Sequence, residues 1–468
     1  MKTEVTTKTA LDGRGQKRKA ETTVRASNRT KKAAISYGEG DAEESASDLE
    51  ETPKPKAKGR ATKKVKVAET KVEAEVDEDG DTKVKTVKRK TKSKASKKET
   101  DLAPLQQRTV DTKLRVGAHV SIAGGVQHSI SNVLQIGANA FALFLKSQRK
   151  WDNPPLEPEN AALFIDGCKK HGIEVGDCCL PHGSYLVNLA HPEAARKKQA
   201  YDSFLDDLTR CHTLGIRLYN FHPGNSNATT REEGIRLIAE HINTAHKDPA
   251  TGSVIPVLET MASLGNTIGG TFKDIAEIIN HVDDKDRVGV CIDTCHVFAA
   301  GYDLRTPEAY AETMTKFDEV IGLKYLKALH MNDSKAPFNS NRDLHAQIGT
   351  GYLGLRAFHN IVNDERLHGL PMVLETPIDA TDANGKKFED KGVWAREIKI
   401  LEQLVGMGVE SDEFKKLESD LQEAGKQERA RIGEQVERKK AKAKPTKGKG
   451  KAKSKKKVET EDEEDSED

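Results

Sequence analysis

Short apolar runs alternate with longer segments of helical spacing between residues 115 and 376. The eight short runs are residues 116–121, 140–145, 175–180, 218–221, 254–258, 288–292, 325–329 and 371–374. Helical spacing is clearest in residues 194–214, 231–246, 272–281 and 307–321. Eight strand–helix repeats predict an α/β fold, a TIM (β/α)₈ barrel, which typically needs about 250 residues. A doubly wound open sheet is the competitor, but no glycine-rich phosphate fingerprint follows the first strand.

The two ends of the chain have a different composition from the middle. Residues 1–112 contain 28 basic and 20 acidic residues and one aromatic residue, Tyr37, so they predict a disordered basic N-terminal arm. Residues 409–468 contain 17 basic and 17 acidic residues. They predict a charged tail, helical or disordered, with a basic run at 438–457 followed by an acidic run at 459–468. The predicted barrel domain is residues 113–408.

Composition excludes several classes of protein. No run of 18 apolar residues occurs and the N-terminus has no apolar signal-peptide core, so we expect a soluble protein with no membrane partner. The six cysteines include an adjacent pair, Cys178 and Cys179, and no C-x-x-C spacing. This pattern favours buried core residues in a reducing compartment over a disulfide framework or a zinc ribbon.

Basic clusters recur at both ends, at residues 16–19, 54–66, 88–90 and 438–457. They favour recognition by the nuclear import machinery, and phosphate-binding arms or plain solvated tails are the alternatives. Glu4 and Asp12 count against a mitochondrial presequence. We therefore expect a nuclear protein and leave a mitochondrial fraction open.

Histidines and carboxylates follow nearly every predicted strand. The strand ends carry His119, residues 146–149, His182, His222, Glu259, Asp293, His296, His330 and Glu375, and Asp343 and His345 form an Asp-x-His pair. In a TIM barrel these ends meet on one face, where uncompensated imidazoles and carboxylates would be unfavourable without cations. A single residue of this kind is more often a satisfied polar group, but the joint pattern predicts a site for Zn²⁺, with Mn²⁺ or Fe²⁺ as alternatives. Nine ligands suit two or three ions if a carboxylate bridges them.

Seven segments of the chain closely resemble the endonuclease IV family of apurinic/apyrimidinic (AP) endonucleases. They are GAHVSIAGG (117–125), AFALFLKSQRKW (140–151), LPHGSYLVNLAHP (180–192), NFHPG (220–224), GVCIDTCH (289–296), AAGYD (299–303) and LHMNDSK (329–335). The resemblance spans essentially all of residues 113–405, and the long tails are similar to those of eukaryotic nuclear members.

The resemblance implies a metal-dependent hydrolase of base excision repair, of the deoxyribonuclease IV type (the phage-T4-induced class). Such an enzyme uses three zinc ions and a zinc-bound hydroxide to cut double-stranded DNA 5′ to an abasic site. It leaves a 3′ hydroxyl and a 5′ deoxyribose phosphate, and it also cleans blocked 3′ ends as a phosphodiesterase. The implied ligand sets are His182, His222 and Glu259; Glu259, Asp293, His330 and Glu375, with Glu259 bridging; and His296, Asp343 and His345.

The same resemblance implies that Arg149, Tyr185 and Leu186 enter the DNA at the lesion. An apolar wedge and a planar cation can replace the stacking lost when a nucleotide is flipped. We expect a monomer.

Two other functions stay open. A metal-dependent sugar isomerase or epimerase would use similar strand-end ligands, but it would not need Arg149, Tyr185 or the basic ends. A chromatin-associated binding module with an inactive barrel would not need all nine ligand-type residues.

Overall fold

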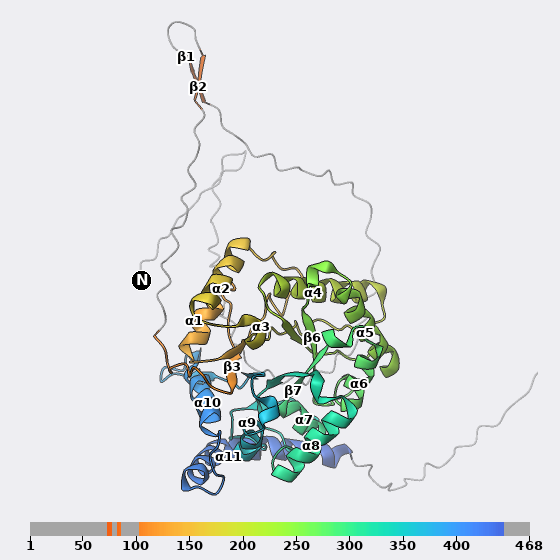
Figure 1. Cartoon of the computed structure of the whole chain (residues 1–468), viewed down its shortest axis with the longest axis vertical. Coiled ribbons are helices and arrows are strands. Elements are labelled where there is room, and N and C mark those ends of the chain that lie inside the picture. Colours follow the sequence, from red (N-terminus) through yellow and green to blue (C-terminus); the bar gives the residue numbers. More distant parts are fainter. Residues whose placement is uncertain (1–72, 77–81, 86–102, 444–468) are drawn as a thin grey trace, which may run out of the picture. The chain divides into compact units, whose positions relative to one another are not determined.

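The computed structural model describes residues 73–76, 82–85 and 103–443. Its centre is a seven-stranded parallel sheet with the strand order β4-β3-β11-β8-β7-β6-β5 (Figure 1). The strands are β3 (Arg115–His119), β4 (Ala140–Ala142), β5 (Leu218–Phe221), β6 (Ile255–Glu259), β7 (Gly289–Asp293), β8 (Leu326–His330) and β11 (Pro371–Leu374). Most of their residues are buried, as expected for parallel strands covered by helices.

The segment after Cys178 closes the gap between the two edge strands β4 and β5. Cys179 bridges Phe141 of β4, and His182 bridges Asn220 of β5, both in parallel. The backbone N–H of Leu180 donates to the carbonyl of Phe141 at 2.9 Å. This segment therefore takes the place of the third strand, and the TIM-barrel prediction is confirmed.

The prediction of a strand over residues 175–180 was wrong in its first part. Val175–Cys178 form a one-turn helix, α3, and extended pairing starts only at Cys179. A short apolar run does not by itself distinguish a buried strand from a helical turn.

A layer of apolar side chains fills the barrel between its strands. One residue from each of seven positions around the barrel contributes, and these are Ala142, Leu180, Leu218, Val257, Cys291, Ala328 and Val373. The layer is distinct from the larger core in which the helices pack against the outside of the sheet. The barrel interior is therefore a packed core, and not a pore.

Helices cover the outside of the sheet (Figure 1). They are α1 (His128–Gln135), α2 (Pro158–Lys170), α4 (Ala194–Thr213), α5 (Arg231–His246), α6 (Phe272–His281), α7 (Thr294–Ala300), α8 (Pro307–Val320), α9 (Gly354–Val362) and α10 (Gly392–Gln403). Short 3₁₀ turns lie at Pro249–Thr251, Lys285–Arg287, Leu323–Tyr325 and Glu365–Leu367. The four helices predicted from spacing are confirmed as α4, α5, α6 and α8.

Capping residues explain where these helices begin. Thr271 and Asp274 form a capping box at α6, in which each side chain accepts the other residue's backbone N–H. The side chain of Thr230 accepts the N–H of Glu233 at the start of α5. The hydroxyl of Thr306 does the same for α8, where Pro307 occupies the first turn.

A long helix, α11 (Asp412–Ala443), follows the barrel helices. Its side chains Phe414, Ile432 and Val436 are buried. The helix therefore packs on the protein through these side chains, although its sequence is highly charged. The domain limits at 112/113 and 408/409 stay predictions.

Six short strands lie outside the seven-stranded sheet in the part of the chain that the structure describes. β9 (Asp333–Ser334) pairs antiparallel with β10 (His345–Ala346). Two further antiparallel pairs are β1 (Glu73–Val76) with β2 (Thr82–Lys85), and β12 (Asp379–Thr381) with β13 (Lys387–Glu389). Among the helices that the structure describes, none is both long and apolar enough to cross a membrane.

The predicted basic clusters at 16–19, 54–66 and 88–90 lie outside the described residues, and the cluster at 438–457 is described only as far as 443. All six cysteines are buried and free of disulfides, which confirms their assignment as core residues.

Candidate metal centre

Most side chains of the site come from residues that lie two positions after a residue of the apolar layer. Along a strand, residues two apart point to the same side. Two residues after Val257 comes Glu259, and two after Ala328 comes His330. The same step leads from the layer to His182, Asn220, Asp293 and Glu375. The barrel therefore delivers these groups to one end of its interior.

Glu259 lies at the centre of this cluster and is fully buried. Its Oε2 lies 3.1 Å from Nε2 of His182 and 3.6 Å from Nε2 of His222. Its Oε1 lies 3.2 Å from Nδ1 of His330 and 3.3 Å from Nδ1 of His296. The two oxygens thus face different sets of imidazoles, the arrangement required of a bridging carboxylate.

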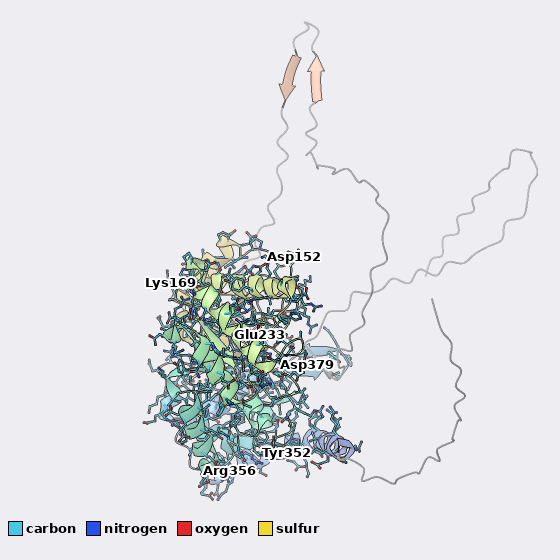
Figure 2. The ribbon with its side chains drawn as sticks, turned by 90° about the vertical axis from the view of Figure 1, so that its right-hand side faces the viewer. Asp152, Lys169, Glu233, Tyr352, Arg356 and Asp379 are labelled. Carbon is cyan, nitrogen blue, oxygen red and sulfur yellow. The ribbon has the colours of Figure 1, made fainter. Side chains whose placement is uncertain are left out.

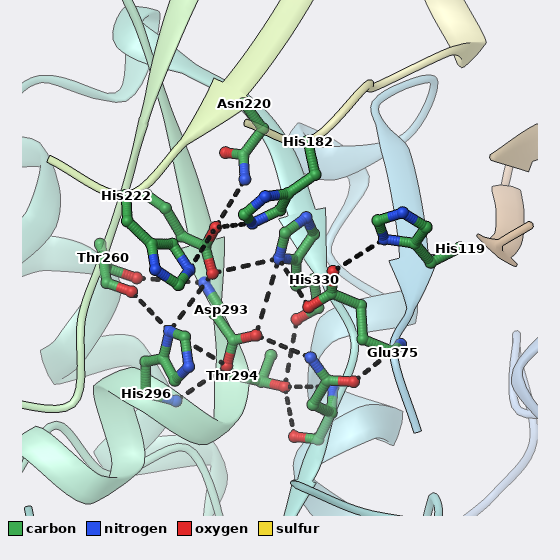
Figure 3. Close-up of polar contacts among 12 residues, drawn as sticks. His119, His182, Asn220, His222, Thr260, Asp293, Thr294, His296, His330 and Glu375 are labelled. Atoms are coloured by element: carbon green, nitrogen blue, oxygen red, sulfur yellow. Dashed lines mark hydrogen bonds and ion pairs between the residues drawn. The ribbon is translucent and has the colours of Figure 1, made fainter. Parts of the chain in front are cut away.

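A second group of ligand atoms surrounds His330. Its Nδ1 lies 3.2 Å from Oε2 of Glu375 and 3.7 Å from Oδ2 of Asp293. With Glu259, these residues offer four ligand atoms within 4.8 Å of one another. His119 lies beside them, with its Nδ1 3.3 Å from the other oxygen of Glu375. His119 is thus a neighbour of the group through Glu375 (Figure 3).

The third group consists of His296, Asp343 and His345. The two Asp343 oxygens lie 3.1 Å from Nε2 of His296 and 3.1 Å from Nε2 of His345. Local structure positions His296, because Asp293 is the N-cap of α7 and its Oδ1 accepts the backbone N–H of His296 at 2.8 Å. The nine predicted ligands thus form three adjoining groups, each with its ligand atoms within 4.8 Å.

Charge governs the protonation of the cluster. Burial alone would raise the pKa of Glu259, but the imidazoles of His330 and His222 outweigh it and hold that pKa well below its usual range. Burial lowers the pKa of His222 to about 4. Burial would also lower the pKa of His345, but the carboxylate of Asp343 raises it to about 10. The carboxylates of Glu259, Asp343 and Glu375 therefore stay ionised, because imidazoles hold their pKa values well below the usual range, whereas burial raises the pKa of Asp293. Imidazole protons balance part of the negative charge. A divalent cation displaces such protons when it binds.

The donor atoms fit divalent metal ions. Imidazole nitrogens and carboxylate oxygens are ligands for Zn²⁺, Mn²⁺ and Fe²⁺. The Nε2 atoms of His296 and His345 are buried and face Asp343, yet they form no hydrogen bond. A cation between these atoms would satisfy all three side chains.

A fourth combination, Asp293, Cys295 and His345, also brings ligand atoms together. Burial raises the pKa of the Cys295 thiol well above its usual value. Because the thiolate is the form that binds metals, this combination is a weaker candidate than the other three.

Supporting residues were missed by sequence reasoning. The Nδ2 of Asn220 donates to Oε2 of Glu259 at 2.5 Å. The Nδ2 of Asn332 donates to Oδ2 of Asp293 at 2.7 Å, and its Oδ1 accepts the N–H of Glu375 at 2.9 Å. Asn220 could have been found from strand alternation, because it lies two residues before His222. Asn332 lies in the LHMNDSK segment, two residues after His330, but its partners Asp293 and Glu375 come from other strands, so the sequence did not show its role.

Thr260 is a further supporting residue. Its hydroxyl accepts the backbone N–H of Asp293 at 3.0 Å, and its carbonyl oxygen lies 2.8 Å from Nδ1 of His296. A hydrogen bond from the second ring nitrogen to a carbonyl fixes the tautomer and leaves Nε2 available as a ligand atom.

Exposed side chains lie beside the three groups. Tyr185 is 58% exposed and Leu186 39% exposed, and the Tyr185 ring centroid lies 5.2 Å from that of His182. The hydroxyl of Ser184 donates to the carbonyl of Gln148 at 2.9 Å, which joins this loop to the loop of the exposed Arg149. The three residues predicted to touch DNA thus come from two loops that are hydrogen-bonded to each other.

Lys146, which the sequence placed in the same strand-end group, has a supporting position. Its ammonium donates to Asp206 at 2.9 Å and to the carbonyl of Ser203 at 2.7 Å, and its side chain is buried. It therefore anchors the start of the Arg149 loop on α4.

Comparison with known proteins shows that the chain is similar to apurinic-apyrimidinic endonucleases. Residues 130–404 match a family model described as a xylose isomerase-like TIM barrel. The chain is 44% identical to apurinic-apyrimidinic endonuclease 1 of Saccharomyces cerevisiae over 297 residues, which cover 64% of this chain and 78% of that protein. It is 45% identical to apurinic-apyrimidinic endonuclease 1 of Plasmodium berghei over 294 residues, 63% of this chain but 57% of that protein.

A solved structure shows the same fold. Endonuclease IV from Thermus thermophilus superposes with a TM-score of 0.52 and 27% identity, covering 62% of this chain and 98% of that one. The similarity thus lies in the barrel and leaves more than a third of this chain unmatched.

Replacing Asn332 by Ala should lower the affinity for divalent zinc about 10- to 100-fold, the usual cost of losing a hydrogen-bond partner behind a metal ligand. Competition with a chromophoric chelator measures this affinity. Asn280→Ala, at an exposed position on α6, is the control. Equal affinities for both variants would show that Asn332 does not hold Asp293 and Glu375 for metal.

Proposed function

The chain belongs to the endonuclease IV family of AP endonucleases, which are metal-dependent hydrolases of DNA repair, and we propose that it hydrolyses the phosphodiester on the 5′ side of abasic sites with three zinc ions. The products are a 3′ hydroxyl and a 5′ deoxyribose phosphate, and blocked 3′ ends are cleaned by the same hydrolysis. The observation that carries this proposal is the set of three adjoining ligand groups beside exposed Tyr185 and Leu186.

The three groups supply one ion site each. His182, His222 and Glu259 would hold the first ion; Glu259, Asp293, His330 and Glu375 would hold the second; and His296, Asp343 and His345 would hold the third. Bound ions of this kind lower the pKa of water and offset the charge of the phosphoryl and leaving oxygens. Asn220 keeps Glu259 oriented between two groups, and Asn332 keeps Asp293 and Glu375 in place.

Glu259→Gln is the direct test of this assignment. The change removes a negative charge from two proposed sites, so incision should fall by more than ~100-fold, beyond the usual loss for a supporting residue. The assay is cleavage of a labelled duplex with one tetrahydrofuran abasic analogue by the full-length chain. Prolonged chelation should abolish incision and zinc should restore it.

Glu312→Gln, an exposed substitution on α8, is the matched control and should cut normally. Normal incision by Glu259→Gln would refute the metal assignment. A zinc-loaded chain that leaves the duplex intact would point instead to the sugar isomerase, if it converts an aldose, or to the binding module, if it only retains DNA. The 44% identity to a yeast AP endonuclease favours DNA over a free sugar.

Lesion recognition belongs to Arg149, Tyr185 and Leu186. Tyr185 presents an exposed aromatic ring beside His182, Leu186 presents an exposed apolar side chain next to it, and Arg149 is a planar cation on the adjoining loop. An unstacked nucleotide would enter beside them. Because they do not belong to the ligand groups, they act on binding and not on the metal.

Tyr185→Ala should weaken binding to the abasic duplex about 10-fold, since stacking of a base on an aromatic ring contributes ~1–3 kcal/mol. Leu186→Ala should act in the same direction. Electrophoretic titration of abasic and undamaged duplexes measures the effect, with Leu163→Ala, exposed on α2, as the control. A uniform change for both duplexes would assign these residues to general DNA binding. Loss of zinc from Tyr185→Ala would instead make it part of the metal centre.

The proposed enzyme works in the nucleus. The proposal rests on the recurrence of these clusters at both ends of the chain.

A fluorescently tagged full-length chain should concentrate in nuclei, and replacing the Lys and Arg residues of 16–19, 54–66, 88–90 and 438–457 by Gln should disperse it. Neutralising the acidic run at 459–468 is the control. An unchanged nuclear signal in the cluster variant would remove the clusters as import signals.

A further inference from the structure

Helix α11 lies beyond residues 130–404, which the family model matches, yet it packs against the segment that carries the third ligand group. The contacts involve the Asp343–His345 stretch and the loop that follows it, residues 347–352. The mechanism proposed above makes no use of this helix.

The residue between the two ligands provides the first contact. Asp343 and His345 point toward His296, and in an extended stretch the residue between them points away. That residue, Leu344, packs in an apolar cluster with Ala336 and with Ile432 and Val436 of α11. The back of the ligand pair therefore rests on the C-terminal helix.

Hydrogen bonds from α11 hold the next part of the loop. The Nε2 of Gln422 donates to the carbonyls of Gly349 at 2.7 Å and Gly351 at 3.2 Å. The guanidinium of Arg429 donates to the carbonyl of Thr350. Three successive loop carbonyls are thus bound by two side chains of one helix.

The loop and the start of helix α9, which follows it, also contribute contacts in return. The hydroxyl of Tyr352 donates to the carbonyl of Arg429 at 2.8 Å, and the guanidinium of Arg356 pairs with the carboxylate of Glu418 at 2.9 Å. Figure 2 labels Tyr352 and Arg356. Loop and helix therefore hold each other through both backbone and side-chain groups.

The helix backbone approaches the loop at two glycines. A Cβ at Gly425 would overlap the carbonyl of Thr350, and one at Gly433 would meet the hydroxyl of Tyr352. Glycine in a helix interior is unfavourable relative to alanine, so its position here allows the close approach.

The rest of the protein holds this segment from the opposite side. The buried carboxylate of Asp333 accepts the N–H groups of Gly351 and Leu353, both at 2.9 Å. The ladder between β9 and β10 pairs only two residues of each strand. Asp343 itself has a side chain that is 46% exposed. The position of the ligand pair therefore depends on how firmly its far side is held.

We propose that α11 is a positioning element of the metal centre, which holds Asp343 and His345 so that the third ion is retained. This inference rests on the proposed function, since it takes that group to be an ion site. The helix acts through Leu344 and the 347–352 loop, and it contributes no ligand.

The test uses the full-length chain with Ile432 and Val436 both replaced by Ala, and separately with Gln422→Ala. Zinc content is measured after dialysis against chelators of graded strength. Both variants should bind the weakest-held ion about 10- to 100-fold less tightly and keep the other ions as the wild type does. Higher free zinc should restore incision. Gln427→Ala, exposed on the same helix, should behave as the wild type.

Three results would overturn the inference: an unchanged zinc affinity in variants that melt at lower temperature, a uniform loss of all ions, and incision that added zinc does not restore. Ile432→Val, which keeps most of the packing, should recover most of the zinc affinity. Failure of the proposed function shows elsewhere, in a wild-type chain that binds no zinc or leaves the abasic duplex intact.

Discussion

Four carboxylates and five imidazoles meet at one end of the barrel, around the fully buried Glu259. Burial penalises each of these groups in its charged form, so the cluster is stable only when opposite charges lie within contact distance. Imidazole protons provide part of this compensation, as the raised pKa of His345 indicates. The proposed zinc ions would provide more of it, and for this reason metal binding and folding of this end of the barrel are linked.

The barrel meets this constraint by strand alternation. Six positions around the barrel contribute one apolar residue to the interior layer and, two residues later, one polar residue to the site. The supporting hydrogen bonds come from the same strand ends or just beyond them, from Asn220, Thr260 and Asn332. The third group is an exception, because Asp343 and His345 lie in the connection between the barrel strands β8 and β11. It is also the group that α11 supports from behind.

In the proposed function, chemistry and lesion recognition belong to separate sets of residues. The ligand groups are mostly buried and held by hydrogen bonds from Asn220 and Asn332, whereas Tyr185, Leu186 and Arg149 are exposed on two loops joined through Ser184. Hydrolysis of a phosphodiester needs fixed charge, and entry into a duplex needs surface that is free before DNA arrives. Substitutions on the loops should therefore change which DNA is bound, and substitutions in the cluster should change whether it is cut.

The sequence by itself determined the barrel, the strand ends and the nine ligand candidates, because alternation and helical spacing are local properties of the chain. It failed at residues 175–178, where a short apolar run forms a helical turn. It did not reveal Asn332, whose partners Asp293 and Glu375 lie 39 and 43 residues away. Nor did it show that charged α11 would pack behind Leu344. Only the tertiary structure decided these contacts, because they join side chains far apart in sequence and leave no periodic signal in either segment.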